Sequence, residues 1–369
     1  MKFPLSRIMT FMLAMVAALL TPNPSRASNA DMLIVWNGFE YWRWEGGNVF
    51  NRLNIPDGIV LKPVLSPDGR DIAFAAIPPI YTILIGGNGF ASSEATDIWL
   101  HNLHTDTLKQ VAAQPKDTVL ISFEEPYKYV VRTDPAWSPD GKQLAWAEFI
   151  QTQKGIEGQT LVIYDLKSAT QRRVTLTSEI QFAPNLSLRG ELQWGDHWIA
   201  ITTPENSRDL NITVYDLKQN LSKSFQLKDA TSFVLGLWYS NQQHSFIIAY
   251  HEQQSGTKYK LLDPTNGVFS ALPLAFRLTS ENGMSKLFFN PINGTYYPQF
   301  KPSFQTASSV CCYPFAAISN DGLRAAYTVE GPPNPITIYQ NEKFETVILP
   351  DNIHQVEALI WGPLQWVLK

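Results

Sequence analysis

The sequence predicts an all-β fold: a single six-bladed β-propeller built from four-stranded antiparallel blades. Two short sequence elements recur along the chain, and the pattern of each predicts strands joined to a turn. The 369 residues are 12% aromatic and include 25 prolines, a composition that favours many short strands joined by turns. A feature that repeats along the chain is interpreted first as architecture.

The first recurring element is a hairpin around a Pro-Asp-Gly or Asn-Asp-Gly turn. Clear copies are "VLSPDGRDIAF" from Val64, "AWSPDGKQLAWAEF" from Ala136 and "AISNDGLRAAY" from Ala317, and degenerate copies occupy 192–202, 236–250 and 359–369. The apolar residues after each turn alternate with a period of two, which is typical of a strand with two different faces. Proline presets φ, aspartate bonds nearby amides and glycine accepts positive φ, so the triplet suits a tight turn.

The aspartates of these turns are Asp68, Asp140 and Asp321. Catalytic acids would have to converge on one point, but each of these residues sits at the same corner of a different blade. We therefore interpret them as turn residues.

The second recurring element is a β-branched and aromatic run that ends in Asn, Asp or Gly, hence a strand entering a turn. Its copies are "MLIVWNG" (32–38), "DIWLHNL" (97–103), "TLVIYDL" (160–166), "NITVYDL" (211–217), "KYKLLDP" (258–264) and "PITIYQN" (335–341). One hairpin plus one such strand and its successor gives a four-stranded unit of the size of a propeller blade.

The expected blades follow from this pairing of elements. They are 64–113, 136–177, 192–228, 235–273 and 316–349, with a split blade made of 357–369 plus 32–54. The N- and C-terminal strands share that last blade and so close the ring, which removes exposed sheet edges. The alternative is a seven-bladed ring, which requires a further sheet built from 284–301.

The repeats "SPDGRDIAF…DIWLHNL" and "WSPDGKQLAWAEF…TLVIYDLKSATQRRVT" resemble the TolB-type, WD40-like (PD40) β-propeller repeat. The resemblance covers nearly all of 31–369, strongly in two blades and weakly in four. It implies the propeller fold but not a function, because propellers host many unrelated activities. The sequence contains no G-x-S-x-G motif of the hydrolases that such propellers accompany.

The first 30 residues have the layout of a secretory signal peptide. Two positive charges in "MKFPLSR" precede the uncharged run "IMTFMLAMVAALL", and small residues suit cleavage after Ala27 or Ala30. An uncleaved anchor is the alternative, although the apolar run is short for a membrane span. We expect an exported protein, periplasmic or extracellular, in which no membrane span remains after cleavage.

The net charge bears on which partners the protein can bind, and the cysteine content bears on what holds the fold together. Without Lys2, Arg7 and Arg26 the chain has 26 basic and 33 acidic residues, a net charge of −7, so nucleic acid is not expected as a partner. The only cysteines are the neighbours Cys311 and Cys312, so the core rather than disulfides must hold the fold together. In an oxidising compartment the two could form a vicinal disulfide, which is strained, or remain free thiols.

Three long connections all fall on the face opposite to the Pro-Asp-Gly turns. They are 76–95, 114–134 and 274–315, and loops of this length in a compact domain are usually functional. The candidate ligand- or partner-binding residues on them are Tyr81, Phe90, Tyr127, Tyr129, Arg132, Tyr296, Tyr297 and Tyr313. The alternative is that these aromatic loops pack on one another as a lid.

The sequence therefore favours a non-catalytic binding or scaffold propeller whose aromatic loops bind a protein or an envelope or extracellular ligand. The alternative is a hydrolase or lyase acting on a polysaccharide or peptide, with Glu94, Glu124, Glu125, Arg132 and Asp134 as candidate site residues.

No cofactor or metal site is predicted. His101 and His104 are interpreted as solvated turn residues, and the glycine-rich stretch 86–90 lacks the helix that a phosphate loop requires.

Overall fold

The structure is a computed structural model of the whole chain. It describes residues 32–37, 40–61, 63–79, 95–118, 128–176, 191–204, 209–228, 234–241, 243–252, 256–272, 278–282, 285–290, 295–300, 316–319, 324–328, 335–340, 343–351, 353, 356, 358–361 and 366–368.

The described residues form seven antiparallel sheets, which we name A to G. Sheet A consists of β29 (Ala358–Ile360), β1 (Ile34–Trp36), β2 (Tyr41–Gly46) and β3 (Val49–Arg52). Sheet B consists of β4 (Ile59–Val60) and β5 (Val64–Leu65), which both pair with β6 (Asp71–Ile77), followed by β7 (Asp97–Asn102) and β8 (Thr107–Ala112). Sheet C consists of β9 (Lys128–Arg132) and β10 (Ala136–Trp137), which both pair with β11 (Gln143–Thr152), followed by β12 (Gly155–Asp165) and β13 (Thr170–Thr175).

Sheet D consists of β14 (Leu192–Gly195), β15 (Trp198–Pro204), β16 (Leu210–Asp216) and β17 (Leu221–Leu227). Sheet E consists of β18 (Val234–Ser240), β19 (Ser245–Glu252), β20 (Gly256–Leu262) and β21 (Phe269–Ala271). Sheet F consists of β30 (Trp366–Leu368), β22 (Leu278–Asn282), β23 (Ser285–Asn290) and β24 (Thr295–Phe300). Sheet G consists of β25 (Ala316–Ile318), β26 (Ala325–Thr328), β27 (Ile336–Gln340) and β28 (Lys343–Val347).

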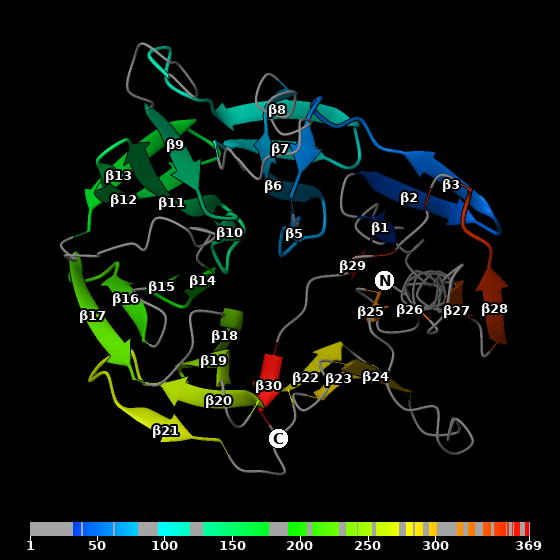
Figure 1. Cartoon of the computed structure of the whole chain (residues 1–369). Coiled ribbons are helices and arrows are strands. Elements are labelled where there is room, and N and C mark those ends of the chain that lie inside the picture. Colours follow the sequence, from blue (N-terminus) through cyan, green and yellow to red (C-terminus); the bar gives the residue numbers. More distant parts are fainter. Residues whose placement is uncertain are drawn as a thin grey trace, which may run out of the picture.

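The sheets surround a common centre, and the first strand named for each of sheets A, D, E, F and G lies nearest to it (Figure 1). In sheets B and C, β5 and β10 lie nearest to the centre (Figure 1). The predicted four-stranded antiparallel sheets are therefore confirmed. In sheets B, C, D, E and G, where the first and second strands are consecutive in the chain, this arrangement places the turn between them on one face of the molecule.

The number of sheets differs from the six that the repeats predict. Three strands of sheet F, β22, β23 and β24, lie within 274–315, which the repeats predict to be a connecting loop. Its sequence, 274–315, contains no Pro-Asp-Gly or Asn-Asp-Gly triplet of the kind that marks the clear repeats. Hydrogen bonding along the backbone forms the sheet without that signal.

The two ends of the described chain contribute to different sheets. β1 pairs with β29 through Ile34↔Ile360, Val35↔Leu359 and Trp36↔Ala358, as expected for a blade shared by both ends. The predicted hairpin 359–369 is wrong, however, because β30 pairs with β22 of sheet F instead. An apolar run shows that a segment is a strand, but it does not show which neighbour supplies its hydrogen-bond partners.

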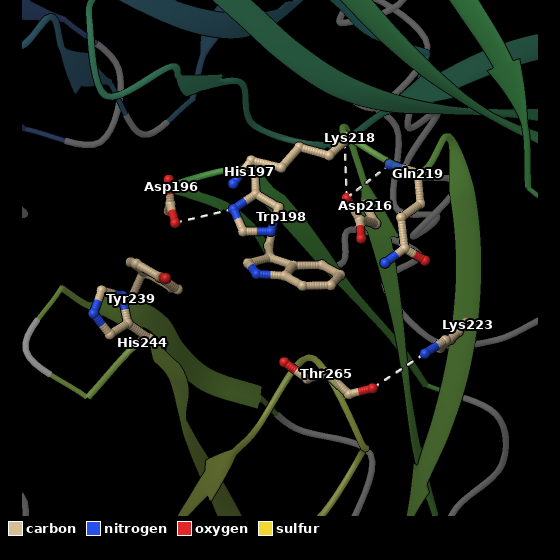
Figure 2. A pocket seen from close by; sticks show the side chains of 10 residues that line it. All are labelled: Asp196, His197, Trp198, Asp216, Lys218, Gln219, Lys223, Tyr239, His244 and Thr265. Atoms are coloured by element: carbon tan, nitrogen blue, oxygen red, sulfur yellow. Dashed lines mark hydrogen bonds and ion pairs between the residues drawn. The ribbon is translucent and has the colours of Figure 1, made fainter.

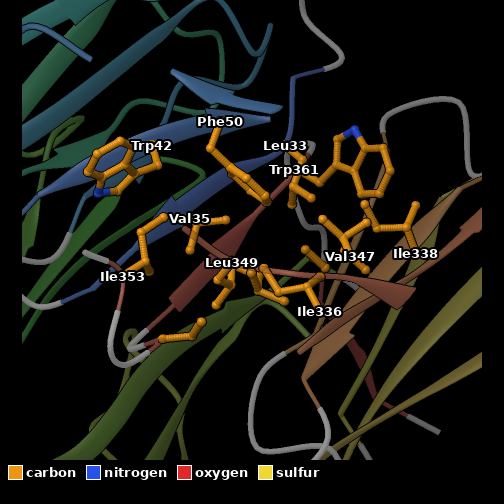
Figure 3. Packing of buried hydrophobic residues seen from close by; sticks show 14 residues of the cluster. Leu33, Val35, Trp42, Phe50, Ile336, Ile338, Val347, Leu349, Ile353 and Trp361 are labelled. Atoms are coloured by element: carbon orange, nitrogen blue, oxygen red, sulfur yellow. The ribbon is translucent and has the colours of Figure 1, made fainter. Parts of the chain in front are cut away.

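Apolar side chains from neighbouring sheets pack against each other to form the core. Between sheets A and G, buried residues from both sheets interdigitate, among them Trp42, Phe50, Ile338 and Trp361 (Figure 3). The ring centroids of Trp44 and Trp361 lie 6.0 Å apart in an edge-on arrangement. Each fully buried side chain of this size stabilises the fold by about 1.5–3 kcal/mol. These inter-sheet layers hold the sheets in place around the centre.

The turns at Asp68 and Asp140 have the chemistry that the sequence predicts. Ser138 Oγ donates to Asp140 Oδ1 at 2.7 Å and accepts from the Gln143 amide at 2.9 Å, and Ser66 and Asp68 make the equivalent bond at 2.7 Å. Gly141 has a φ of 69°, which suits glycine. The hydrogen bond from Ser138 lowers the pKa of Asp140. Asp321 lies outside the described residues.

Candidate functional site

A pocket of about 400 Å³ lies at the centre of the molecule, between the innermost strands of six sheets. Its volume falls in the range of small-molecule sites, about 300–1,000 Å³. We call it the axial pocket. Its lining residues are Pro63, Val64, Leu65, Pro67, Pro135, Ala136, Trp137, Ser138, Pro139, Leu192, Gln193, Trp194, Gly195, Tyr239, Asn241, Ala317, Leu359, Ile360 and Trp361.

The axial pocket is apolar and uncharged. Its walls carry three indole side chains, from Trp137, Trp194 and Trp361, and four prolines. None of its lining residues is Asp, Glu, Lys, Arg or His. Burial, and secondarily the charge of Asp196, raise the pKa of Tyr239 to about 12, so its hydroxyl stays protonated at neutral pH. These side chains suit binding of a neutral ligand and provide no acid–base pair for catalysis.

Two hydrogen-bond donors in the pocket wall have no partner among the described residues. They are Trp194 Nε1 and the hydroxyl of Tyr239, in side chains that are more than nine-tenths buried. The third wall indole differs, because Trp137 Nε1 donates to the Val64 carbonyl at 3.0 Å and so joins sheets B and C. A buried donor without a partner costs about 1–3 kcal/mol.

The axial pocket extends to the face that carries the Pro-Asp-Gly turns, since Pro67, Pro139 and Asn241 line it. The sequence instead predicts binding residues on the opposite face, on the long connections. The pocket residues come from six sheets that are far apart in the sequence, and each one taken alone looks like an ordinary core residue. The one local signal is the recurring Trp before the turn, at Trp137, Trp194 and Trp361.

A second pocket, of about 360 Å³, opens between sheets D and E on the same face (Figure 2). We call it the interblade pocket. It is polar, and its lining residues are Asp196, His197, Trp198, Asp216, Lys218, Gln219, Lys223, Tyr239, His244 and Thr265. The indole of Trp198 lies among these side chains, and the ring of His197 lies at a centroid distance of 4.6 Å, tilted by 37°.

Arg132, one of the predicted binding residues, is buried between sheets B and C and is 3% exposed. Its Nε donates to Glu148 Oε1 at 2.8 Å, and its two terminal nitrogens donate to the carbonyls of Thr96 and Ala113. Burial acts to raise the pKa of Glu148, but the charge and hydrogen bond of Arg132 outweigh it and lower the pKa overall. Burial raises the pKa of Asp97, whose Oδ1 lies 3.9 Å from the guanidinium. All these contacts are within the chain itself.

Of the other predicted binding residues, the structure describes only three. Tyr129 lies in β9, opposite Gln151, and packs against the core between sheets C and D. Tyr296 and Tyr297 lie in β24, opposite Phe289 and Phe288. The remaining aromatic candidates, the cysteine pair and three of the candidate carboxylates lie outside the described residues: Tyr81, Phe90, Tyr127, Tyr313, Cys311, Cys312, Glu94, Glu124 and Glu125. Their role in binding, redox chemistry or catalysis stays a prediction.

The interpretation of His101 as a solvated turn residue is wrong. His101 belongs to strand β7, is fully buried, and its Nε2 lies 2.8 Å from Asp106 Oδ1. Burial lowers its pKa, while the hydrogen bond to Asp106 opposes the shift. The strand continues two residues beyond the apolar run, which brings this side chain under the following turn. Among the described residues, no three His, Cys, Asp or Glu side chains are arranged to hold a metal ion.

No model of a known protein family matches the sequence, and no curated protein matches it. Among solved structures, it is similar to the dihydro-heme d1 dehydrogenase NirN, with 12% identity, a TM-score of 0.50, and 93% of this chain and 78% of that chain covered. It is also similar to TolB from Acinetobacter baumannii, with 14% identity, a TM-score of 0.43, and 94% and 70% covered. A third is the β-propeller domain of the Trilobed protease from Pyrococcus furiosus, with 12% identity, a TM-score of 0.44, and 79% and 85% covered.

In fold, the chain resembles the TolB-type and WD40-like β-propellers. The resemblance predicted from the repeats is thus confirmed. At these identities the likeness concerns the fold alone. The part of the chain that the structure describes contains no helix long and apolar enough to span a membrane.

Proposed function

We propose that this protein is an exported, non-catalytic binding propeller of seven blades, whose ring is closed by the pairing of β1 with β29. It binds an uncharged, mainly apolar part of a protein or cell-envelope ligand in the axial pocket. The aromatic loops predicted on the opposite face provide a second binding surface. The layout of residues 1–30 supports export.

The observation that carries this proposal is the composition of the axial pocket. Three indoles and four prolines line a space of about 400 Å³ with no charged lining residue. Aromatic side chains in a concave, largely dehydrated site dominate the energetics of many interfaces. A hydrolase or lyase needs ionisable groups that converge on the substrate, and the lining of this pocket has no carboxylate, amine, guanidinium or imidazole group. Binding is therefore favoured over catalysis.

The experiment places a charge in the pocket and asks whether partners are lost. Gln193 lines the pocket from β14 and is only partly buried, so Gln193→Arg introduces a cation at the wall. Gln226→Arg is the matched control, because Gln226 is exposed on β17, the outermost strand of the same sheet. A third variant lacks 78–92 and tests the loop surface separately.

Each variant is immobilised and exposed to solubilised native envelope fraction, and captured proteins and lipids are identified by mass spectrometry. Gln193→Arg is expected to lose ligands that wild type and Gln226→Arg both retain, because burying a charge without a partner is costly. As a direct test of the axial pocket, a neutral fluorescent probe, N-phenyl-1-naphthylamine, is titrated into wild type and all variants. Identical captured sets and identical probe binding in wild type and Gln193→Arg would refute the axial site.

A further inference from the structure

The interblade pocket is lined by a turn of the repeat that is shorter in sheet D than in sheets B and C. In sheets B and C, a four-residue loop follows the first strand, as in Pro139–Lys142. In sheet D, Gly195 pairs directly with Trp198, so that only Asp196 and His197 form the turn. Asp196 has a φ of 51°, as a two-residue hairpin requires. The missing residues leave space beside sheet E, whose own turn 241–244 keeps the full length.

The walls of the interblade pocket are held by hydrogen bonds within sheets D and E. Asp216, which is 4% exposed, accepts from the amides of Lys218 and Gln219 at 2.8 and 3.1 Å. Lys223 Nζ donates to the carbonyl of Thr265 at 3.1 Å and so ties sheet D to sheet E. The side chains of Asp216 and Lys223 are therefore held in place before any ligand arrives, which reduces the entropy lost on binding.

The pocket offers donors and acceptors in balanced number. The two lysines are matched by the two aspartates, so the formal charge of the lining is zero. The Lys218 ammonium and the His244 ring, both on exposed residues, are available as donors. Oδ2 of Asp196 lies 2.9 Å from Nδ1 of His197, and the Asp196 side chain is half exposed. Beside these polar groups, the indole of Trp198 and the ring of Tyr239, 8% and 7% exposed, border the pocket with a narrow apolar edge (Figure 2).

We propose that the interblade pocket binds a neutral saccharide of one or two rings. A sugar hydroxyl both donates and accepts hydrogen bonds, so it can use ammonium, imidazole, amide and carboxylate groups at one site. The C–H face of a sugar ring is apolar and packs on an aromatic side chain. A phosphate or another simple anion needs an excess of cationic donors, which this lining lacks. The volume of about 360 Å³ suits a ligand of this size.

The site is distinct from the axial pocket, although Tyr239 forms part of the wall of both. Its hydroxyl is buried without a partner among the described residues. Burial of the Tyr239 ring on the backbone of Gly195 fixes the boundary between the two pockets, since a Cβ at Gly195 would come within 1.9 Å of the ring.

The test uses the double variant Lys218→Ala/His244→Asn. Asparagine is chosen because residue 244 has a φ of 48°, which asparagine tolerates. The matched control is Lys167→Ala, because Lys167 holds the same place in the exposed turn Asp165–Ser168 of sheet C and does not line the pocket. Far-ultraviolet circular dichroism and thermal unfolding verify that all variants are folded.

Calorimetric titrations use maltose, cellobiose, N,N′-diacetylchitobiose and, as the anion probe, inorganic phosphate, each up to about 10 mM so that millimolar Kd values are measurable. At least one disaccharide is expected to bind wild type and Lys167→Ala equally, and the double variant at least about tenfold more weakly. The proposal is overturned if no disaccharide binds, if the double variant binds as tightly as wild type, or if phosphate alone binds at this site. The axial site is tested through Gln193, so the two outcomes are independent.

Discussion

Replacing Arg132 with methionine tests whether this residue holds sheets B and C together or serves a ligand. The substitution keeps most of the apolar stem and removes the guanidinium. It takes from Glu148 its 2.8 Å partner and from the Ala113 carbonyl another 2.8 Å donor, at a site that is 3% exposed. Glu148 keeps the indole of Trp146, at 3.1 Å, and the guanidinium of Arg173.

The expected cost follows from the burial of the ion pair. Removing one partner of a buried pair costs about 3–5 kcal/mol. Glu148 keeps its contacts with Trp146 and Arg173, so the loss is expected at the lower end of this range. Arg173→Met is the matched control, since Arg173 contacts the same carboxylate but is 51% exposed. Solvent screens the half-exposed guanidinium of Arg173, so the control is expected to lose less stability than Arg132→Met does. The double variant Arg132→Met/Glu148→Leu removes both charges and is expected to recover part of the loss.

Urea unfolding followed by tryptophan fluorescence and circular dichroism measures these differences. With a slope of about 2–3 kcal/mol per molar urea, Arg132→Met is expected to lower the midpoint by about 1–2 M. The reasoning is refuted if Arg132→Met lowers stability by less than about 1 kcal/mol or no more than Arg173→Met does. That result would make Arg132 a candidate for ligand binding again.

Three further predictions concern the turns and the buried histidine. Ser138→Ala removes the hydrogen bond to Asp140 and is expected to cost about 1 kcal/mol and to raise the pKa of Asp140, as measured by urea unfolding and an NMR titration; an unchanged pKa would contradict it. The pKa of His101 is lowered in the fold, so the unfolded chain binds the proton more readily, and stability is expected to fall as the pH drops below about 6.5. Thermal melts across that range should show a weaker fall in His101→Gln, and parallel curves would count against the assignment. Gly195→Ala is expected to cost about 1–3 kcal/mol and to weaken binding in both pockets, because its Cβ displaces the Tyr239 ring; wild-type stability and binding would exclude this packing.

The turn chemistry was readable from the sequence because it is local. The Ser, Asp and Gly of "SPDG" satisfy each other's hydrogen bonds within six residues, so the interpretation of Asp140 as a turn residue needed no knowledge of distant neighbours. The alternating strands and the four-stranded antiparallel sheets follow from the same kind of short-range pattern.

The partners of the last strands were not readable in the same way. The segment 359–369 has the pattern of a hairpin, yet its halves pair with β1 and β22, which are more than 80 residues away. The sequence favoured six sheets and offered sheet F only as the alternative, because 274–315 lacks the repeated triplet. Arg132 likewise follows a long connection, and only the packing of β9 on β11 shows that its side chain is enclosed.

By itself, the sequence determined the fold class, the position of most strands and the face on which the Pro-Asp-Gly turns lie. These properties depend on propensity, periodicity and turn chemistry within a few residues. Only the tertiary structure decided the number of sheets, the burial of Arg132 and His101, and the existence of both pockets. The axial pocket combines Trp137, Trp194 and Trp361 from three sheets, and the interblade pocket depends on a turn shortened by two residues beside a neighbouring sheet. Such sites arise from the relative placement of distant segments, which no local pattern encodes.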